Sequence, residues 1–125
     1  MNLFGGQFMI NEINSYGTIE YTNVALENIV GRVVSATPGV VDLYAKNVTE
    51  VAKKMIQKDN YSTGIIIEEV NNNTIKITIS IIASAEIRLS EVAKNIIENV
   101  KNDIEKITDL NVSNVTVTIH GVKEA

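Results

Sequence analysis

His120 is the residue of this sequence best suited to proton transfer at neutral pH, because it is the single histidine of the chain. A catalytic base also needs a nucleophile within reach and a carboxylate that orients the ring. Thr116 and Thr118 share the face of the strand expected around His120, but no orienting carboxylate is evident. The pattern favours a surface or edge histidine, and a pH-sensitive contact and a catalytic base are the alternatives.

Other reactive residue types do not converge. The chain has no cysteine, which excludes disulfides and thiolate metal ligands. Glu68 and Glu69 are neighbours in an expected strand, so they point to opposite faces and cannot work as an acid–base pair. We therefore expect no enzyme, and no catalytic, metal-binding or cofactor-binding residues. One alternative is an enzyme subunit whose site is completed by another chain around three polar residues, Glu86, Arg88 and His120.

The charge balance bears on the choice of partner. Eleven basic and fifteen acidic residues give a net charge of −4, without the clustered positive field that nucleic acids and anionic lipids attract. The first sixteen residues carry no Lys or Arg, which argues against a secretion signal. No stretch approaches the roughly 18 apolar residues that span a bilayer. We expect a cytoplasmic protein with no nucleic-acid partner and no direct membrane insertion.

A chain of 125 residues favours a single domain. Residues 1–16 contain Gly5-Gly6 and a loose apolar set, which predict a flexible N-terminal arm or a sticky segment for a partner. Residues 17–125 are predicted to form one α+β domain. Its first strand is expected at residues 17–21, followed by a helix that Thr22 or Asn23 caps and Pro38-Gly39 terminates.

The middle of the chain has the clearest pattern. Residues 40–44 predict a short strand, and a capping-box pattern at residues 47–50 predicts an extra short helix. Residues 64–70 and 74–83 predict a hairpin, since Ile75, Ile77, Ile79 and Ile81 alternate with polar residues. The longest helix is expected at residues 91–108 with Ser90 as its cap, and the last strand at residues 113–122.

These elements predict an α+β fold, a two-layer βαββαβ sandwich with helices packed on one face of a mostly antiparallel sheet. The extra short helix precedes the central hairpin. A ferredoxin-like arrangement is the default expectation, and the strand order stays open. The other sheet face would carry polar and β-branched side chains, which either face solvent or form a protein contact. The residues of this possible interaction face are Lys76, Thr78, Ser80, Ile82, Thr116, Thr118 and His120.

The order of these segments resembles the alkaline-shock-protein family of Gram-positive cell-envelope stress proteins. The marks are Gly17-Thr18-Ile19 before the first helix, Pro38-Gly39-Val40, Gly64 before the hairpin, the strand of residues 75–81, and the ending of residues 115–122. The resemblance implies a non-catalytic, cytoplasmic protein that self-associates, lies near the membrane through a membrane-anchored partner and serves envelope homeostasis or alkaline stress. A small-ligand or nucleic-acid-binding module is the alternative function.

Overall fold

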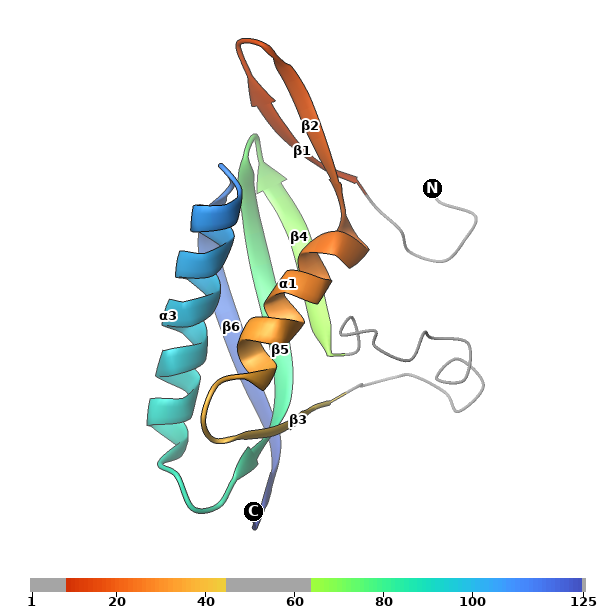
Figure 1. The fold of residues 1–125 in the computed structure, drawn as a ribbon. Coiled ribbons are helices and arrows are strands. Elements are labelled where there is room, and N and C mark those ends of the chain that lie inside the picture. Colours follow the sequence, from red (N-terminus) through yellow and green to blue (C-terminus); the bar gives the residue numbers. More distant parts are fainter. Residues whose placement is uncertain (1–8, 45–63, 125) are drawn as a thin grey trace, which may run out of the picture.

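The computed structural model describes residues 9–44 and 64–124 (Figure 1). They form a four-stranded main sheet, a separate two-stranded hairpin and two helices, which confirms the predicted α+β class. The extra short helix predicted after residue 47 lies outside the described residues. In chain order the elements are β1 (Met9–Asn14), β2 (Gly17–Thr22), α1 (Asn23–Ser35), β3 (Val40–Leu43), β4 (Ile65–Asn71), β5 (Thr74–Ser84), α3 (Leu89–Ile107) and β6 (Asn111–Lys123).

β5 is the central strand of the main sheet. β6 runs parallel to it along one side, while β4 and β3 share the other side and are both antiparallel to β5. At Ser80 the strand that pairs with β5 changes from β4 to β3. The Ser80 N–H donates to the Gly64 carbonyl and its C=O accepts from the Tyr44 N–H, both at 2.8 Å. Gly64 has φ +87°, and a Cβ there would lie 2.6 Å from the Tyr44 carbonyl oxygen. Only glycine therefore lets the two strands meet at this point.

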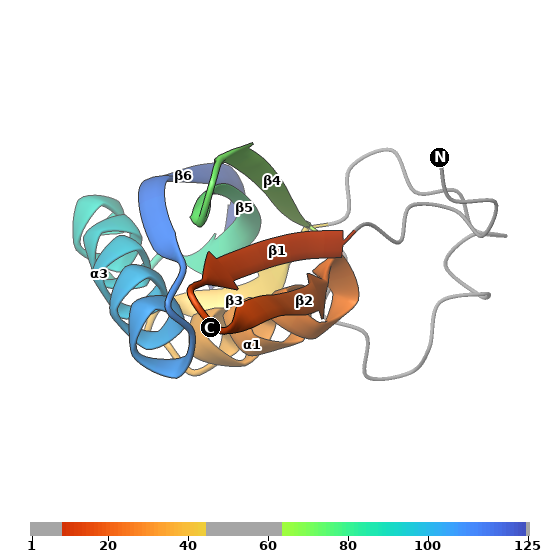
Figure 2. The same cartoon turned by 90° about the horizontal axis from the view of Figure 1, so that it is seen from above.

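The two helices lie on the same face of the main sheet (Figures 1 and 2). On that face alternate residues of β5 are fully buried and form one hydrophobic cluster with apolar residues of both helices. The β5–α3–β6 crossover explains the parallel pair, since a strand that returns after a helix joins the sheet in the same direction. The cluster residues of β5 and the helices are Leu26, Val30, Val34, Ile75, Ile77, Ile79, Ile81, Ala83, Val92, Ile96, Val100 and Ile104.

The N-terminal hairpin differs from the sequence-based expectation. Residues 9–14, which we placed in the N-terminal arm, form β1 and pair antiparallel with β2. β2 therefore belongs to a separate two-stranded sheet, so the ferredoxin-like arrangement does not describe this fold. Ile10 joins the core at 3% exposure, and the next residue on the same face is the buried carboxylate Glu12. A glutamate on the buried face interrupts the apolar alternation that would have predicted this strand.

Two polar contacts attach the hairpin to the rest of the domain. Glu12 Oε1 accepts hydrogen bonds from the Tyr21 hydroxyl at 3.0 Å and from the Asp109 N–H at 2.8 Å. The Asn73 side chain accepts from the Ile13 N–H at 2.7 Å and donates to the Ile13 carbonyl at 3.0 Å. Asn73 has φ 58° in the turn between β4 and β5, and asparagine tolerates that conformation.

The helix starts are partly as predicted. Thr22 caps α1, because its hydroxyl accepts a hydrogen bond from the Ala25 N–H at 3.0 Å. The prediction that Ser90 caps the long helix is wrong, since α3 begins at Leu89 and its capping position is Arg88, which makes no side-chain cap bond. Ser90 instead lies in the first turn of the helix.

Candidate interaction surface

The face of the main sheet opposite the helices, which we call the open face, carries all seven predicted interaction residues. The register places Thr78 beside Thr116 and Ser80 beside Thr118, so hydroxyl side chains from β5 and β6 adjoin. Lys76, Thr116, Thr118 and His120 are exposed, whereas Thr78, Ser80 and Ile82 are half-buried. The structure thus brings the predicted residues together, and their role as a contact surface stays a prediction.

His120 lies at an irregularity of β6, because Ile119 pairs with Ile81 and Gly121 with Ile82, which leaves His120 between them. Its ring stacks on Tyr44, with ring centroids 4.2 Å apart and planes at 22°. Tyr44 follows β3 on the opposite side of β5, so the two rings meet across the open face. Tyr44 was not among the predicted contact residues, although it follows Leu43 in the strand predicted at residues 40–44, where alternate side chains point to opposite faces.

The carboxylates near this surface do not form a reactive group. Glu68 lies opposite Lys76 and pairs with its Nζ at 3.8 Å, and both side chains are about half exposed to solvent. Glu69 is in register with the buried Ile75, which agrees with the prediction that Glu68 and Glu69 point to opposite faces. Within residues 9–44 and 64–124, no group of His, Cys, Asp and Glu side chains could hold a metal ion. Glu86 and Arg88 are exposed and make no side-chain hydrogen bond or ion pair with His120.

The outer edge of β6 forms the border of the open face. Near its beginning, the Val112 N–H donates to Glu105 Oε2 at 2.9 Å and the Val112 carbonyl accepts from Lys101 Nζ at 3.3 Å. These bonds from α3 cover the edge at Val112. The hydrogen bond from Val112, followed by that from Lys101, lowers the pKa of Glu105. Beyond Val112, no described strand pairs with this side of β6.

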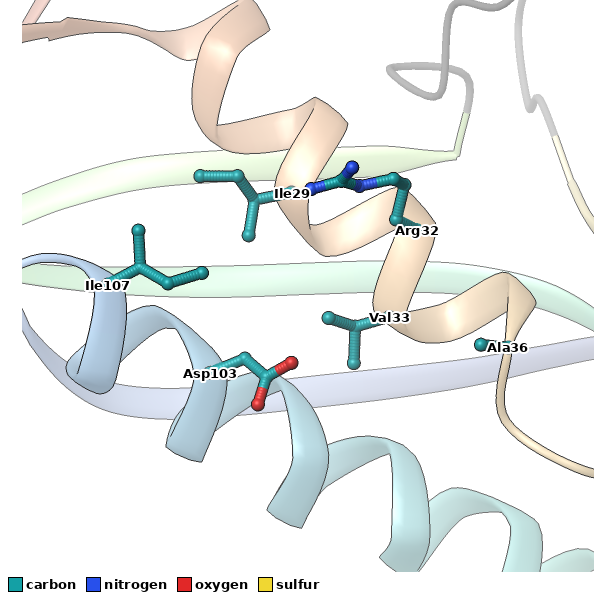
Figure 3. Close-up of a pocket in the computed structure, with 6 residues that line it drawn as sticks. All are labelled: Ile29, Arg32, Val33, Ala36, Asp103 and Ile107. Atoms are coloured by element: carbon teal, nitrogen blue, oxygen red, sulfur yellow. The ribbon is translucent and has the colours of Figure 1, made fainter.

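A shallow groove lies on the opposite side of the molecule, between the two helices (Figure 3). Ile29, Arg32, Val33 and Ala36 of α1 line it together with Asp103 and Ile107 of α3, and its volume is about 240 Å³. Arg32 and Asp103 reach its rim from different helices (Figure 3). The lining is mostly aliphatic, so the groove offers no catalytic or metal-binding chemistry. Among the described helices, none is long and apolar enough to cross a bilayer.

Comparison with known proteins identifies the family. The family model of alkaline shock protein 23, described as having a "cell envelope-related function", matches residues 11–124. The matched range includes all the strands and helices described above, apart from Met9 and Ile10 at the beginning of β1. This chain belongs to the alkaline-shock-protein family. The predicted resemblance is thereby confirmed, and so is the predicted relation of the family to the cell envelope.

Two bacterial relatives are similar over most of their length. The uncharacterized protein Spy1614 of Streptococcus pyogenes is 27% identical over 108 residues, which cover 86% of this chain and 88% of that protein. The uncharacterized protein YloU of Bacillus subtilis is 28% identical over 109 residues, which cover 86% of this chain and 90% of that protein. No solved structure matches the chain.

Proposed function

We propose that this member of the alkaline-shock-protein family is a non-catalytic envelope-homeostasis protein of the cytoplasm that self-associates and binds a membrane-anchored protein. The family supports the link to the cell envelope. The observation that carries the proposal is the open face, on which the predicted contact residues adjoin across β5 and β6. No group of described residues favours the small-ligand or nucleic-acid alternative.

The chemistry of the open face fits a protein partner. Thr78, Ser80, Thr116 and Thr118 supply neutral hydroxyl groups, and the one lysine is compensated by Glu68. Ile66 adds an apolar side chain at 58% exposure, and the stacked Tyr44 and His120 rings add a flat surface. Apolar and neutral polar groups with little net charge are typical of protein interfaces. Anionic lipid would instead need clustered basic residues.

Membrane recruitment through a protein can be separated from binding to lipid. Purified protein should sediment with a bacterial membrane fraction but not with protein-free vesicles made from the same lipids. Pre-treatment of the membranes with protease should abolish sedimentation, because the anchor is a protein. Ile66→Asp combined with Thr78→Lys should reduce the bound fraction about tenfold, since charges without partners would be buried against the anchor.

Tyr16→Asp is the matched control, because Tyr16 is 98% exposed in the turn of the β1–β2 hairpin, which is a separate sheet from the one that carries the open face. This variant should sediment like the unchanged protein. Equal binding to protein-free vesicles, or equal loss in both variants, would remove the proposed role of the open face. Self-association is measured separately by light scattering over a concentration series, and a monomer at every concentration would contradict that part of the proposal.

A further inference from the structure

The outer edge of β6 lacks the features that usually keep an exposed strand from pairing. Exposed edge strands are commonly protected by charged residues, proline or a covering segment. Residues 111–122 contain no Asp, Glu, Lys, Arg or Pro. In the described chain, the hydrogen bonds from α3 to this edge are at Val112, through Lys101 and Glu105. A long, neutral edge is therefore left next to the open face.

The register identifies the backbone groups that this edge presents. Ser80 turns its N–H and C=O toward β4 and β3, so its neighbours Ile79 and Ile81 turn theirs toward β6. In a parallel pair, those bonds go to the residues that flank the register partner. The register partners of β5 residues 77, 79 and 81 are Val115, Val117 and Ile119. These three residues consequently direct their own N–H and C=O groups outward.

We propose that two copies of this chain pair antiparallel through this edge, with Val117 opposite Val117 of the second copy. The proposal rests on the self-association proposed above and specifies its geometry. Val115 then lies opposite Ile119 of the second copy, and the outward backbone groups of both strands are satisfied together. On the open face, Thr116 lies opposite Thr118 of the second copy, which is a favourable cross-strand pair. The two main sheets join into one, with both open faces on the same side.

In this pairing, the flank of α3 beside the edge lies next to the same flank of the second copy. From Val112 to Val117 a strand advances roughly 16 Å, which about eleven helical residues match, so the two-fold axis passes beside α3 at about the level of Lys94. Ile97, 37% exposed, lies one turn before Lys101 on the flank that reaches Val112, and Lys94 lies about one turn before Ile97. In each copy Ile97 lies within about one helical turn of the axis, so an exposed apolar side chain of both copies lies beside the contact.

Charge substitutions at the two open-face threonines test the pairing. Thr116→Lys/Thr118→Lys and Thr116→Glu/Thr118→Glu each place like charges opposite each other, which destabilises the pair. Both side chains are exposed, so the fold of each copy should persist. By light scattering, the unchanged protein should reach twice 13.7 kDa, and each variant alone should stay at 13.7 kDa. An equal mixture of the two variants should return to the doubled mass, because lysine then faces glutamate.

Asn28→Lys/Asn102→Lys is the matched control, because it adds the same charge at exposed positions of α1 and α3. It should keep the doubled mass. A doubled mass that persists in the lysine and glutamate variants alone would overturn edge pairing and leave self-association intact. A monomeric unchanged protein would overturn both edge pairing and the proposed self-association, and would leave the proposed membrane-anchored partner to the sedimentation experiment.

Amide exchange in the unchanged protein provides a test that needs no variant. With rising concentration, exchange at Val115, Val117 and Ile119 should slow about tenfold, because their amides gain partners in the second copy. The amides of Thr116 and Thr118 already face β5 and should change little. Equal slowing along the whole of β6, or none while the mass doubles, would contradict the proposal.

Discussion

The main sheet and the β1–β2 hairpin are both β structures, yet different forces attach them to the domain. The main sheet buries Ile75, Ile77, Ile79 and Ile81 completely beneath the two helices. The hairpin inserts Ile10 into the same core and packs the partly buried Tyr21 against it, whereas four other large side chains are about half exposed or more: Met9, Ile13, Tyr16 and Ile19. Its remaining attachment is polar, through Glu12 and Asn73.

This difference separates stability from orientation. Apolar burial is non-directional and contributes most of the free energy of folding. A hydrogen bond contributes only about 1 kcal/mol net, but it fixes direction. We therefore expect the main sheet and its helices to unfold together, while the hairpin opens at a lower free energy without unfolding the core.

The largest effect should come from Ile77→Ala in the main sheet. Removing a fully buried isoleucine side chain should lower the free energy of unfolding by about 2–5 kcal/mol, measured by urea denaturation. Ile66→Ala on the open face is the control, because Ile66 is 58% exposed and its loss should cost less than about 1 kcal/mol. Similar losses in the two variants would mean that the open face is as well packed as the core.

Glu27 is a buried polar group within the hydrophobic helix layer, so the stability of this layer should depend on pH. Glu27 is 6% exposed, and burial raises its pKa from 4.5 to about 7, although a hydrogen bond from Asn23 Nδ2 at 3.1 Å acts in the opposite direction. The folded state thus holds this proton more tightly than the unfolded state. Stability should fall as the pH rises from about 4.5 to about 7, and the loss should persist above that range.

Glu27→Gln should remove this pH dependence. At pH 8 the variant should be more stable than the unchanged protein by on the order of 2–3 kcal/mol, and at pH 4 the difference should largely vanish. Urea denaturation at the two pH values measures the effect, with the exposed Glu20→Gln as the control. An equal difference at both pH values would show that Glu27 acts through packing and not through ionisation.

The same contrast explains what the sequence could predict. The β4–β5 hairpin and the long helix were predicted within a few residues, because the period of their apolar residues is unambiguous, as in Ile75–Ile81. The alternation of apolar and polar residues along β5 and β6 also placed the predicted contact residues of these strands on one face of the sheet. β1 was missed because Glu12 interrupts its apolar pattern, and without β1 the partner of β2 could not be predicted. The pairing of β6 with β5 depends on contacts distant in sequence, such as Thr74 with Asn111. Such contacts leave no periodic pattern of residues in the local sequence.

The smallest effect should come from Asn73→Gly, which separates the hairpin from the main sheet. Glycine accepts the φ of 58°, so the variant removes only the two hydrogen bonds to Ile13 and adds backbone freedom to the unfolded chain. Because Ile13 is 49% exposed, water can replace those bonds, and the expected loss is about 1 kcal/mol.

Asn72→Gly is the control for backbone freedom, since Asn72 is exposed in the same turn. In the Asn73→Gly variant, the Ile13 amide should exchange about tenfold faster, while the Ile77 amide in the core should keep its rate. Faster exchange at both amides would show that hairpin and sheet open as one cooperative unit. The polar contacts of Asn73 would then stabilise the whole domain, and the division between a packed sheet and a separately anchored hairpin would fail.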